Sequence, residues 1–124
     1  MNRPEQDIHK AVAAHLRQRG APGLLWWHTA NGAHYGKRNR RGAAIQGAIM
    51  KGLGVRAGVS DIVALHQGKF FALELKAPGG RATEAQLEFI GDVQRNGGFT
   101  CVAEGLDEAL RAIETWGLVR GVSA

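Results

Sequence analysis

Acidic residues are absent from the chain between Ile8 and Ser60, almost half of its 124 residues. The same interval holds nine basic residues: Lys10, Arg17, Arg19, Lys37, Arg38, Arg40, Arg41, Lys51 and Arg56. Lysines and arginines that neutralise phosphates release counterions, so a stretch of one sign favours a polyanionic partner. A solvated basic surface is the alternative, but the uneven distribution of the net charge of +5 makes nucleic acid the better interpretation.

Cysteine and long apolar runs are also scarce. The single Cys101 excludes an internal disulfide and any zinc site built from several cysteines, which suits a reducing compartment. No apolar run approaches the roughly 18 residues of a membrane span, and the residues after Met1 lack the apolar core of a signal peptide. We therefore expect a cytoplasmic protein without a membrane partner, folded as one domain over residues 1–124.

Hydrophobic periodicity and turn residues predict four helices and four strands. Helices are expected over residues 4–19, 43–51, 84–95 and 106–116, and strands over residues 24–29, 58–65, 70–76 and 99–103. No repeat or linker divides the chain. The order helix, strand, helix, strand, strand, helix, strand, helix is typical of an α/β sandwich.

The two central strands carry ionisable residues although both are apolar enough for the middle of a sheet. If a tight turn is centred between residues 67 and 68, Asp61 lies opposite Glu74 on the neighbouring strand. Lys76 shares a face with Glu74, because residues two apart in a strand point to the same side. Two carboxylates that close repel each other unless a cation lies between them.

Such a group suits phosphodiester hydrolysis. Mg²⁺ is held by one or two carboxylates, and a nearby lysine can orient water or stabilise the growing negative charge. The alternative is a solvated Glu–Lys pair, since Glu-x-Lys is a common triplet. The position of Asp61 opposite Glu74 and the acid-free half of the chain favour the catalytic interpretation.

Several other polar residues and one basic segment also call for an interpretation. Glu5 lies on the apolar face of the first helix, where an acid also complements the helix dipole, the simpler account. Gln86 is at the capping-box position of the helix that Thr83 opens. His28 and His34 lack a third metal ligand at matching spacing, so we interpret them as surface or satisfied histidines. The glycine-rich basic segment 30–42 predicts a surface loop suited to phosphate contact and base stacking.

Three motifs together carry a resemblance to a known family. They are Gly58-Val59-Ser60-Asp61, Glu74-Leu75-Lys76 and Thr83-Glu84-Ala85-Gln86. In this order they resemble the PD-(D/E)xK nuclease superfamily, and more narrowly the VRR-NUC (virus-type replication-repair nuclease) domain. Glu5 matches a glutamate in the first helix of that family, and Asn31-Gly32 matches an Asn-Gly after its first strand. Ser60 departs from the pattern, which usually has proline there; because proline only stiffens the strand entry, we expect activity to survive.

The resemblance implies a restriction-endonuclease-like core, a central mixed β-sheet flanked by helices. It implies a Mg²⁺-dependent endonuclease, with Mn²⁺ able to substitute, that hydrolyses DNA and selects branched structures such as four-way junctions or flaps. Stand-alone domains of this size resemble phage and bacterial nucleases of DNA repair, some of which act as homodimers. A non-catalytic nucleic-acid-binding module is the alternative.

The resemblance also implies roles for individual residues. The metal ligands would be Glu5, Asp61, Glu74 and the Leu75 carbonyl, and the catalytic residues Asp61, Glu74, Lys76 and Gln86. Nucleic-acid contacts are expected from Asn31, Lys37, Arg38, Arg40, Arg41, Lys51 and Arg56. Under this reading Glu5 does more than complement a dipole, and Gln86 both caps its helix and supports the site.

Overall fold

A mixed four-stranded sheet forms the centre of the protein, whose computed structural model describes residues 3–30 and 40–121. The strands are β1 (Leu25–His28), β2 (Ile62–His66), β3 (Lys69–Lys76) and β4 (Phe99–Glu104), in the spatial order β1-β2-β3-β4. The β1–β2 and β2–β3 pairs are antiparallel, whereas β3 and β4 are parallel. The expected α/β fold with a central mixed sheet is confirmed.

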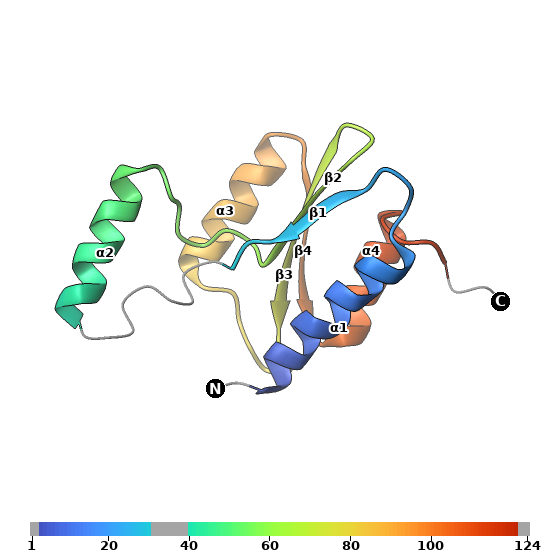
Figure 1. Ribbon diagram of the computed structural model, residues 1–124, viewed down its shortest axis with the longest axis horizontal. Coiled ribbons are helices and arrows are strands. Elements are labelled where there is room, and N and C mark those ends of the chain that lie inside the picture. The colour runs from blue at the N-terminus through green and yellow to red at the C-terminus, as the bar shows by residue number, and fades with distance from the viewer. Residues whose placement is uncertain (1–2, 31–39, 122–124) are drawn as a thin grey trace.

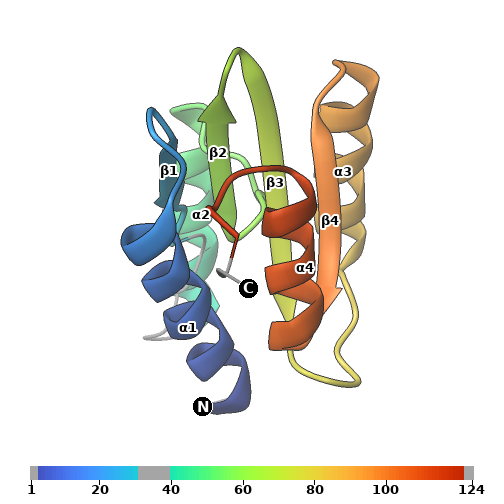
Figure 2. The same ribbon diagram turned by 90° about the vertical axis from the view of Figure 1, so that its right-hand side faces the viewer.

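Four helices accompany the sheet in the described part of the chain. They are α1 (Arg3–Arg19), α2 (Arg40–Gly52), α3 (Glu84–Arg95) and α4 (Leu106–Thr115). Helices α1 and α4 lie side by side on one face, and α3 covers the β3–β4 side of the other face (Figure 2). Helix α2 stands apart from the sheet (Figure 1). Among the described residues, no helix is long and apolar enough to cross a membrane.

The alternation of side chains along β3 builds the core on both faces. Phe71, Leu73 and Leu75 pack into the main apolar cluster with α1 and α4. Ala72 faces the other way, into a smaller cluster with Val93 of α3. Since residues two apart share a face, Glu74 must lie on the α3 side, where the strand is fully covered.

The β2–β3 hairpin has the predicted register. Gln67 and Gly68 form its two-residue turn with φ angles of 52° and 78°, the positive pair of a type I′ turn. Pairing from His66↔Lys69 to Ile62↔Leu73 then places Asp61, one residue further, opposite Glu74. The strand itself begins at Ile62 rather than at residue 58.

Helix α2 and the basic loop before it remain to be compared, since apart from the start of β2 the other elements agree with expectation to within one residue at each end. Helix α2 begins at Arg40 rather than at residue 43, since the good helix propensity of arginine extends the apolar helical pattern backwards. Most of the predicted basic loop, residues 31–39, lies outside the described residues.

Candidate active site

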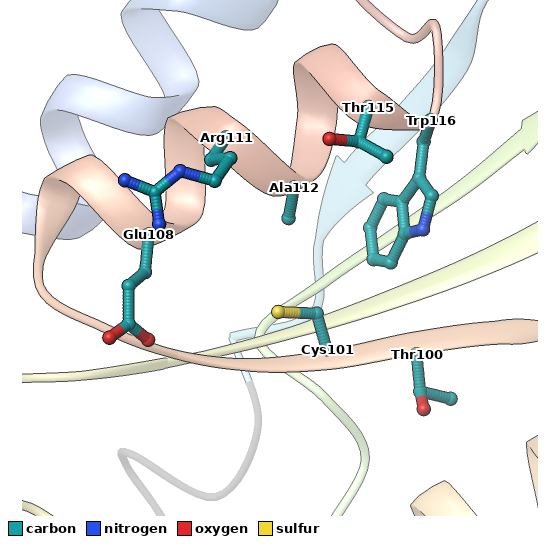
Figure 3. A pocket seen from close by; sticks show the side chains of 7 residues that line it. All are labelled: Thr100, Cys101, Glu108, Arg111, Ala112, Thr115 and Trp116. Atoms are coloured by element: carbon teal, nitrogen blue, oxygen red, sulfur yellow. The ribbon is translucent and has the colours of Figure 1, made fainter.

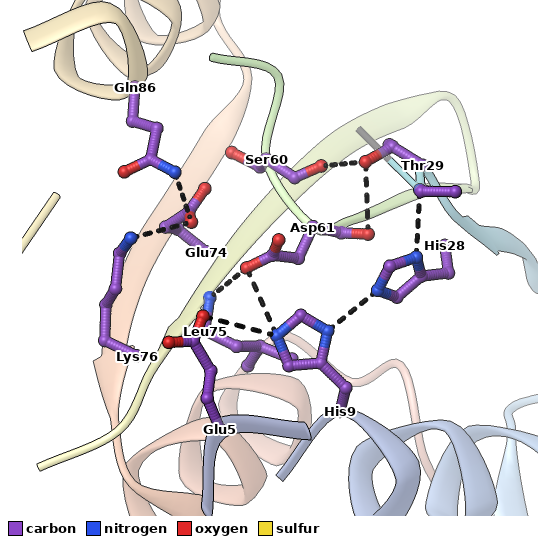
Figure 4. A network of polar contacts seen from close by, with 11 residues as sticks. Glu5, His9, His28, Thr29, Ser60, Asp61, Glu74, Leu75, Lys76 and Gln86 are labelled. Atoms are coloured by element: carbon purple, nitrogen blue, oxygen red, sulfur yellow. Dashed lines mark hydrogen bonds and ion pairs between the residues drawn. The ribbon is translucent and has the colours of Figure 1, made fainter. Parts of the chain in front are cut away.

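The residues predicted from the sequence to be catalytic or to bind a metal lie close together where β3 ends (Figure 4). Helix α1 contributes Glu5, the segment before β2 contributes Asp61, β3 contributes residues 74–76, and α3 contributes Gln86. Four separate parts of the chain therefore build one polar site in an otherwise apolar sheet.

Asp61 is tied to the backbone of β3. Its Oδ2 accepts a hydrogen bond of 2.7 Å from the N–H of Leu75. The N–H and C=O of a strand residue point to the same edge of the strand, so the Leu75 carbonyl is also directed towards the Asp61 side. β2 begins only at Ile62 and does not extend to this position. The Asp61 carboxylate and the Leu75 carbonyl oxygen thus lie at the same edge of β3.

Glu74 is the electrostatic centre of the site, with only 1% of its surface exposed. Its Oε2 accepts a 2.9 Å hydrogen bond from Gln86 Nε2 and lies 3.5 Å from Lys76 Nζ, whereas its Oε1 has no hydrogen-bond partner among the described residues. Burial, and next the neighbouring Asp61, raise the pKa of Glu74 to about 8, against the opposing effect of Lys76. A buried carboxyl with a free oxygen beside a second carboxyl fits a divalent cation, which would satisfy both.

Gln86 performs two tasks at once. Its Oε1 accepts a hydrogen bond of 2.7 Å from the Thr83 N–H and completes the capping box of α3, while its Nε2 donates to Glu74. Gly58 makes this approach possible: it has φ of 82°, and a Cβ there would overlap the Ala85 carbonyl in the first turn of α3. The glycine therefore helps to set the height of Gln86 above the strand.

Glu5 reaches the site through a residue that the sequence did not single out. His9 follows Glu5 by one helical turn, and its Nε2 lies 4.0 Å from Glu5 Oε1 and 3.7 Å from Asp61 Oδ2. The spacing of four residues, which puts both side chains on one helix face, is a signal that could have found His9.

His28, interpreted from sequence as a surface or satisfied histidine, is exposed and has hydrogen-bond partners. Its Nε2 lies 2.8 Å from His9 Nδ1, and its Nδ1 accepts a 2.9 Å hydrogen bond from the Ala30 N–H. Partial burial and the nearby His9 ring lower the pKa of His28. His9, His28 and Asp61 place potential ligand atoms within 4.8 Å of one another, so the fold supplies neighbours that sequence spacing did not reveal. His34 lies outside the described residues.

Thr29 fixes the chain at Asp61 from the neighbouring strand end. Its N–H donates to the Asp61 carbonyl and its Oγ1 to the Ser60 carbonyl, both at 2.9 Å. Ser60 is fully buried, and its own Oγ has no hydrogen-bond partner within the described part of the chain. The serine hydroxyl is therefore not what holds this segment in place.

A comparison with known families decides the relationship. The family model of the VRR-NUC domain matches residues 3–107 of the chain. The chain belongs to the VRR-NUC family. A solved structure described as "VRR_NUC domain protein" has the same fold, with a TM-score of 0.68 and 22% sequence identity over 100% of this chain and 98% of that one. No match was found among curated proteins.

Of the basic residues expected to contact DNA, those that the structure describes lie away from the centre of this VRR-NUC site. Lys51 is exposed in the last turn of α2, and Arg40 and Arg41 begin that helix. Arg56 forms a 2.6 Å ion pair with Asp92 and lies over the ring of Phe89, at 5.3 Å from its centroid. Asn31, Lys37 and Arg38 fall outside the described residues.

A pocket of about 360 Å³ lies between β4 and α4, separate from the VRR-NUC motifs (Figure 3). Cys101 lines it together with Glu108 and Trp116. Burial, and next the charge of Glu108, raise the pKa of the half-buried Cys101 thiol. The thiol is thereby kept protonated and unreactive, so this pocket does not resemble a second catalytic centre.

Proposed function

We propose that this VRR-NUC domain is an endonuclease that hydrolyses phosphodiester bonds of DNA with Mg²⁺, for which Mn²⁺ can substitute. The observation that carries the proposal is the pairing of Asp61 with the buried Glu74. Without a cation this arrangement disfavours ionisation of Glu74, and a purely structural site gains nothing from it.

The oxygen donors match the proposed cofactor. Glu5, Asp61, Glu74 and the Leu75 carbonyl would hold the cation, and hard oxygen ligands of this kind suit Mg²⁺ and Mn²⁺. When bound, the cation supplies Lewis-acid activation of the phosphate and of water. The protein contributes the fixed positions: the Leu75 N–H orients Asp61, and the Gln86 amide orients Glu74.

Lys76 provides the positive charge for the reaction. Its side chain is 12% exposed and is held 3.5 Å from Glu74 Oε2, on the same face of β3. An ammonium group fixed at this position can orient the attacking water or stabilise negative charge that develops on the phosphate. Because water is largely excluded around it, its electrostatic effect is stronger than on an open surface.

The finer part of the proposal concerns substrate and assembly. We infer a preference for branched DNA, such as four-way junctions or flaps, and a homodimer, because symmetric cleavage of a junction needs two active sites. Helix α2 supports this: Ile45 and Ile49 within it and Leu53 directly after it recur at a spacing of four residues, and each is more than half exposed. Lys51, two residues from both Ile49 and Leu53 and therefore on the opposite side of the helix, would contact the DNA backbone.

The decisive experiment offers linear, nicked, flapped and four-way-junction DNA in the presence of Mg²⁺, Mn²⁺ or EDTA. We expect cleavage of the branched substrates with either cation and none in EDTA. Lys76→Ala should abolish cleavage and leave DNA binding nearly intact. Unchanged cleavage by this variant would overturn the assignment of Lys76, and salt-sensitive DNA binding without nicking of any substrate would show a binding module instead.

A further inference from the structure

Two histidines border the candidate metal site without belonging to any motif of the family resemblance. His9 projects from α1 and His28 from the end of β1, and their rings meet beside Asp61 (Figure 4). The ring centroids are 5.0 Å apart with an interplanar angle of 48°. Their hydrogen bonds determine which nitrogen of each ring carries the proton.

The chain of hydrogen bonds starts at the backbone. The Ala30 N–H can only donate, so the His28 Nδ1 that receives it has a free lone pair. The proton of His28 is then on Nε2, which donates across 2.8 Å to His9 Nδ1. Because that nitrogen accepts, the proton of His9 is on its own Nε2. One backbone N–H therefore fixes the tautomers of both rings.

The result is an N–H directed at two carboxylates. His9 Nε2 is buried and has no hydrogen-bond partner among the described residues, although Asp61 Oδ2 lies 3.7 Å away and Glu5 Oε1 4.0 Å away. A buried donor without a partner is costly, so a buried N–H this near two carboxylates calls for an explanation. Both nearby oxygens belong to residues that would hold the cation.

We propose that His9 is a positioning residue of the metal site, whose Nε2–H orients the carboxylates of Glu5 and Asp61, and that His28 fixes its tautomer. The inference rests on the proposed function, because it requires a cation at these carboxylates. Donors behind metal-binding carboxylates commonly set the direction of their free lone pairs, and their loss weakens metal affinity about 10- to 100-fold.

The same hydrogen bonds argue against direct coordination by the imidazoles. A coordinating histidine offers a lone pair to the metal and usually donates its other N–H to an acceptor. His28 does the reverse, since its Nδ1 receives a backbone N–H and its Nε2 carries the proton. The proximity of His9, His28 and Asp61 therefore supports an oxygen-ligand site with a histidine behind it, rather than a zinc-type site.

Direct titration with Mn²⁺ in the absence of DNA tests the role of His9. His9→Leu should weaken Mn²⁺ affinity about 10-fold or more. His9→Gln should restore most of it, because a glutamine amide N–H can reach the position of Nε2, whereas His9→Asn should not. His66→Gln is the matched control: His66 also has a buried ring nitrogen without a partner within the described chain, but it lies at the turn end of β2.

The outcomes separate this inference from the proposed function. Wild-type Mn²⁺ affinity in His9→Leu overturns the positioning role, and so does a failure of His9→Gln to restore affinity. Asp61→Asn and Glu74→Gln should remove Mn²⁺ binding altogether. If they retain it, the proposed metal site itself is wrong; if they lose it while His9→Leu binds normally, only the role of His9 is wrong.

The tautomers are measured independently by long-range ¹H–¹⁵N correlation of the histidine rings. We expect the proton on Nε2 in both His9 and His28, and a mixture of tautomers for His9 in His28→Phe, together with a smaller loss of Mn²⁺ affinity than in His9→Leu. A proton on Nδ1 of His9 in the wild-type protein would overturn the inference. A merely structural role for the pair would lower thermal stability without changing Mn²⁺ affinity.

Discussion

Two contacts between a basic side chain and a carboxyl group in this protein have opposite character. Arg56 and Asp92 meet at 2.6 Å on the surface, with side chains 41% and 38% exposed. Lys76 and Glu74 lie 3.5 Å apart, with side chains 12% and 1% exposed. The shorter contact is therefore the one between the more exposed side chains. Hydrogen bonds from Arg56 first, and Arg95 next, lower the pKa of Asp92, whereas burial and Asp61 raise that of Glu74.

The difference separates an exposed carboxylate whose two oxygens are both paired from a buried carboxyl group that is only partly paired. Asp92 gives both of its oxygens to arginines. Glu74 retains one oxygen without a partner among the described residues, and its lysine does not offset the effects of burial and of Asp61. Incomplete pairing in a buried position is the feature on which the proposed metal site rests.

The largest expected effect is on catalysis. Glu74→Gln keeps the shape of the side chain but removes the charge needed to hold a cation, so single-turnover cleavage of branched DNA should fall by at least about 10²-fold. Asp92→Asn removes the charge of the surface carboxylate and should cleave at close to the wild-type rate. Equal losses in the two variants would erase the distinction between the pairs.

The pH dependence of stability should also differ between the pairs. In metal-free protein, Glu74 keeps its proton up to about pH 8, whereas the unfolded chain releases it near the ordinary pKa of 4.5. The native state then binds more protons between these values, so the free energy of unfolding should fall as the pH rises from about 5 to 8. Urea unfolding in EDTA measures this slope, which Glu74→Gln should flatten and Mg²⁺ should reduce.

Asp92 should contribute with the opposite sign. Its lowered pKa means that the unfolded chain takes up a proton first on acidification. Its stabilisation is therefore present above the ordinary pKa of 3.8 and is lost as the pH falls further. Asp92→Asn should lower the urea midpoint above about pH 4, and this difference from the wild type should shrink as the pH falls further; a difference that grows on acidification would contradict this assignment.

A backbone change at Gly58 should have a smaller but double effect. Gly58→Ala strains a positive φ and drives a methyl group into the first turn of α3, so we expect a loss of about 2 kcal/mol in unfolding free energy and slower cleavage. Gly23→Ala is the control, with nearly the same φ of 83° and open space at the Cβ position. It should lose stability only through strain and leave cleavage unchanged.

The smallest effect is expected at Ser60. Its buried hydroxyl has no partner in the described structure, so Ser60→Ala should leave cleavage unchanged and keep or raise thermal stability slightly. A clear loss of stability in differential scanning fluorimetry would show that the hydroxyl is bonded after all.

The sequence was sufficient for the hairpin register and for the position of Gln86, because local rules determine both. A two-residue turn containing Gly68 sets the register, and the register places Asp61 opposite Glu74. The capping-box motif likewise predicted the position of Gln86 in the first turn of α3. The roles of these residues, unlike their positions, remain predictions.

The His9–His28 pair could not be predicted in the same way. The two residues are 19 positions apart on different elements, and only the packing of α1 against the sheet brings the rings together. No turn or periodicity links them. The early start of α2 at Arg40 has a different origin, since propensity extended a helix beyond its apolar pattern.

The Gln67–Gly68 turn has a consequence for how this protein can change. Surface turns usually tolerate insertions and deletions, because nothing packs against them. Here a one-residue slip of the strands would turn Glu74 and Lys76 into the apolar cluster and carry Leu75 out of it. The number of residues in the turn therefore sets which residues lie opposite each other at the far end of the hairpin. Relatives that keep the nuclease chemistry should conserve the length of this turn even where its sequence varies.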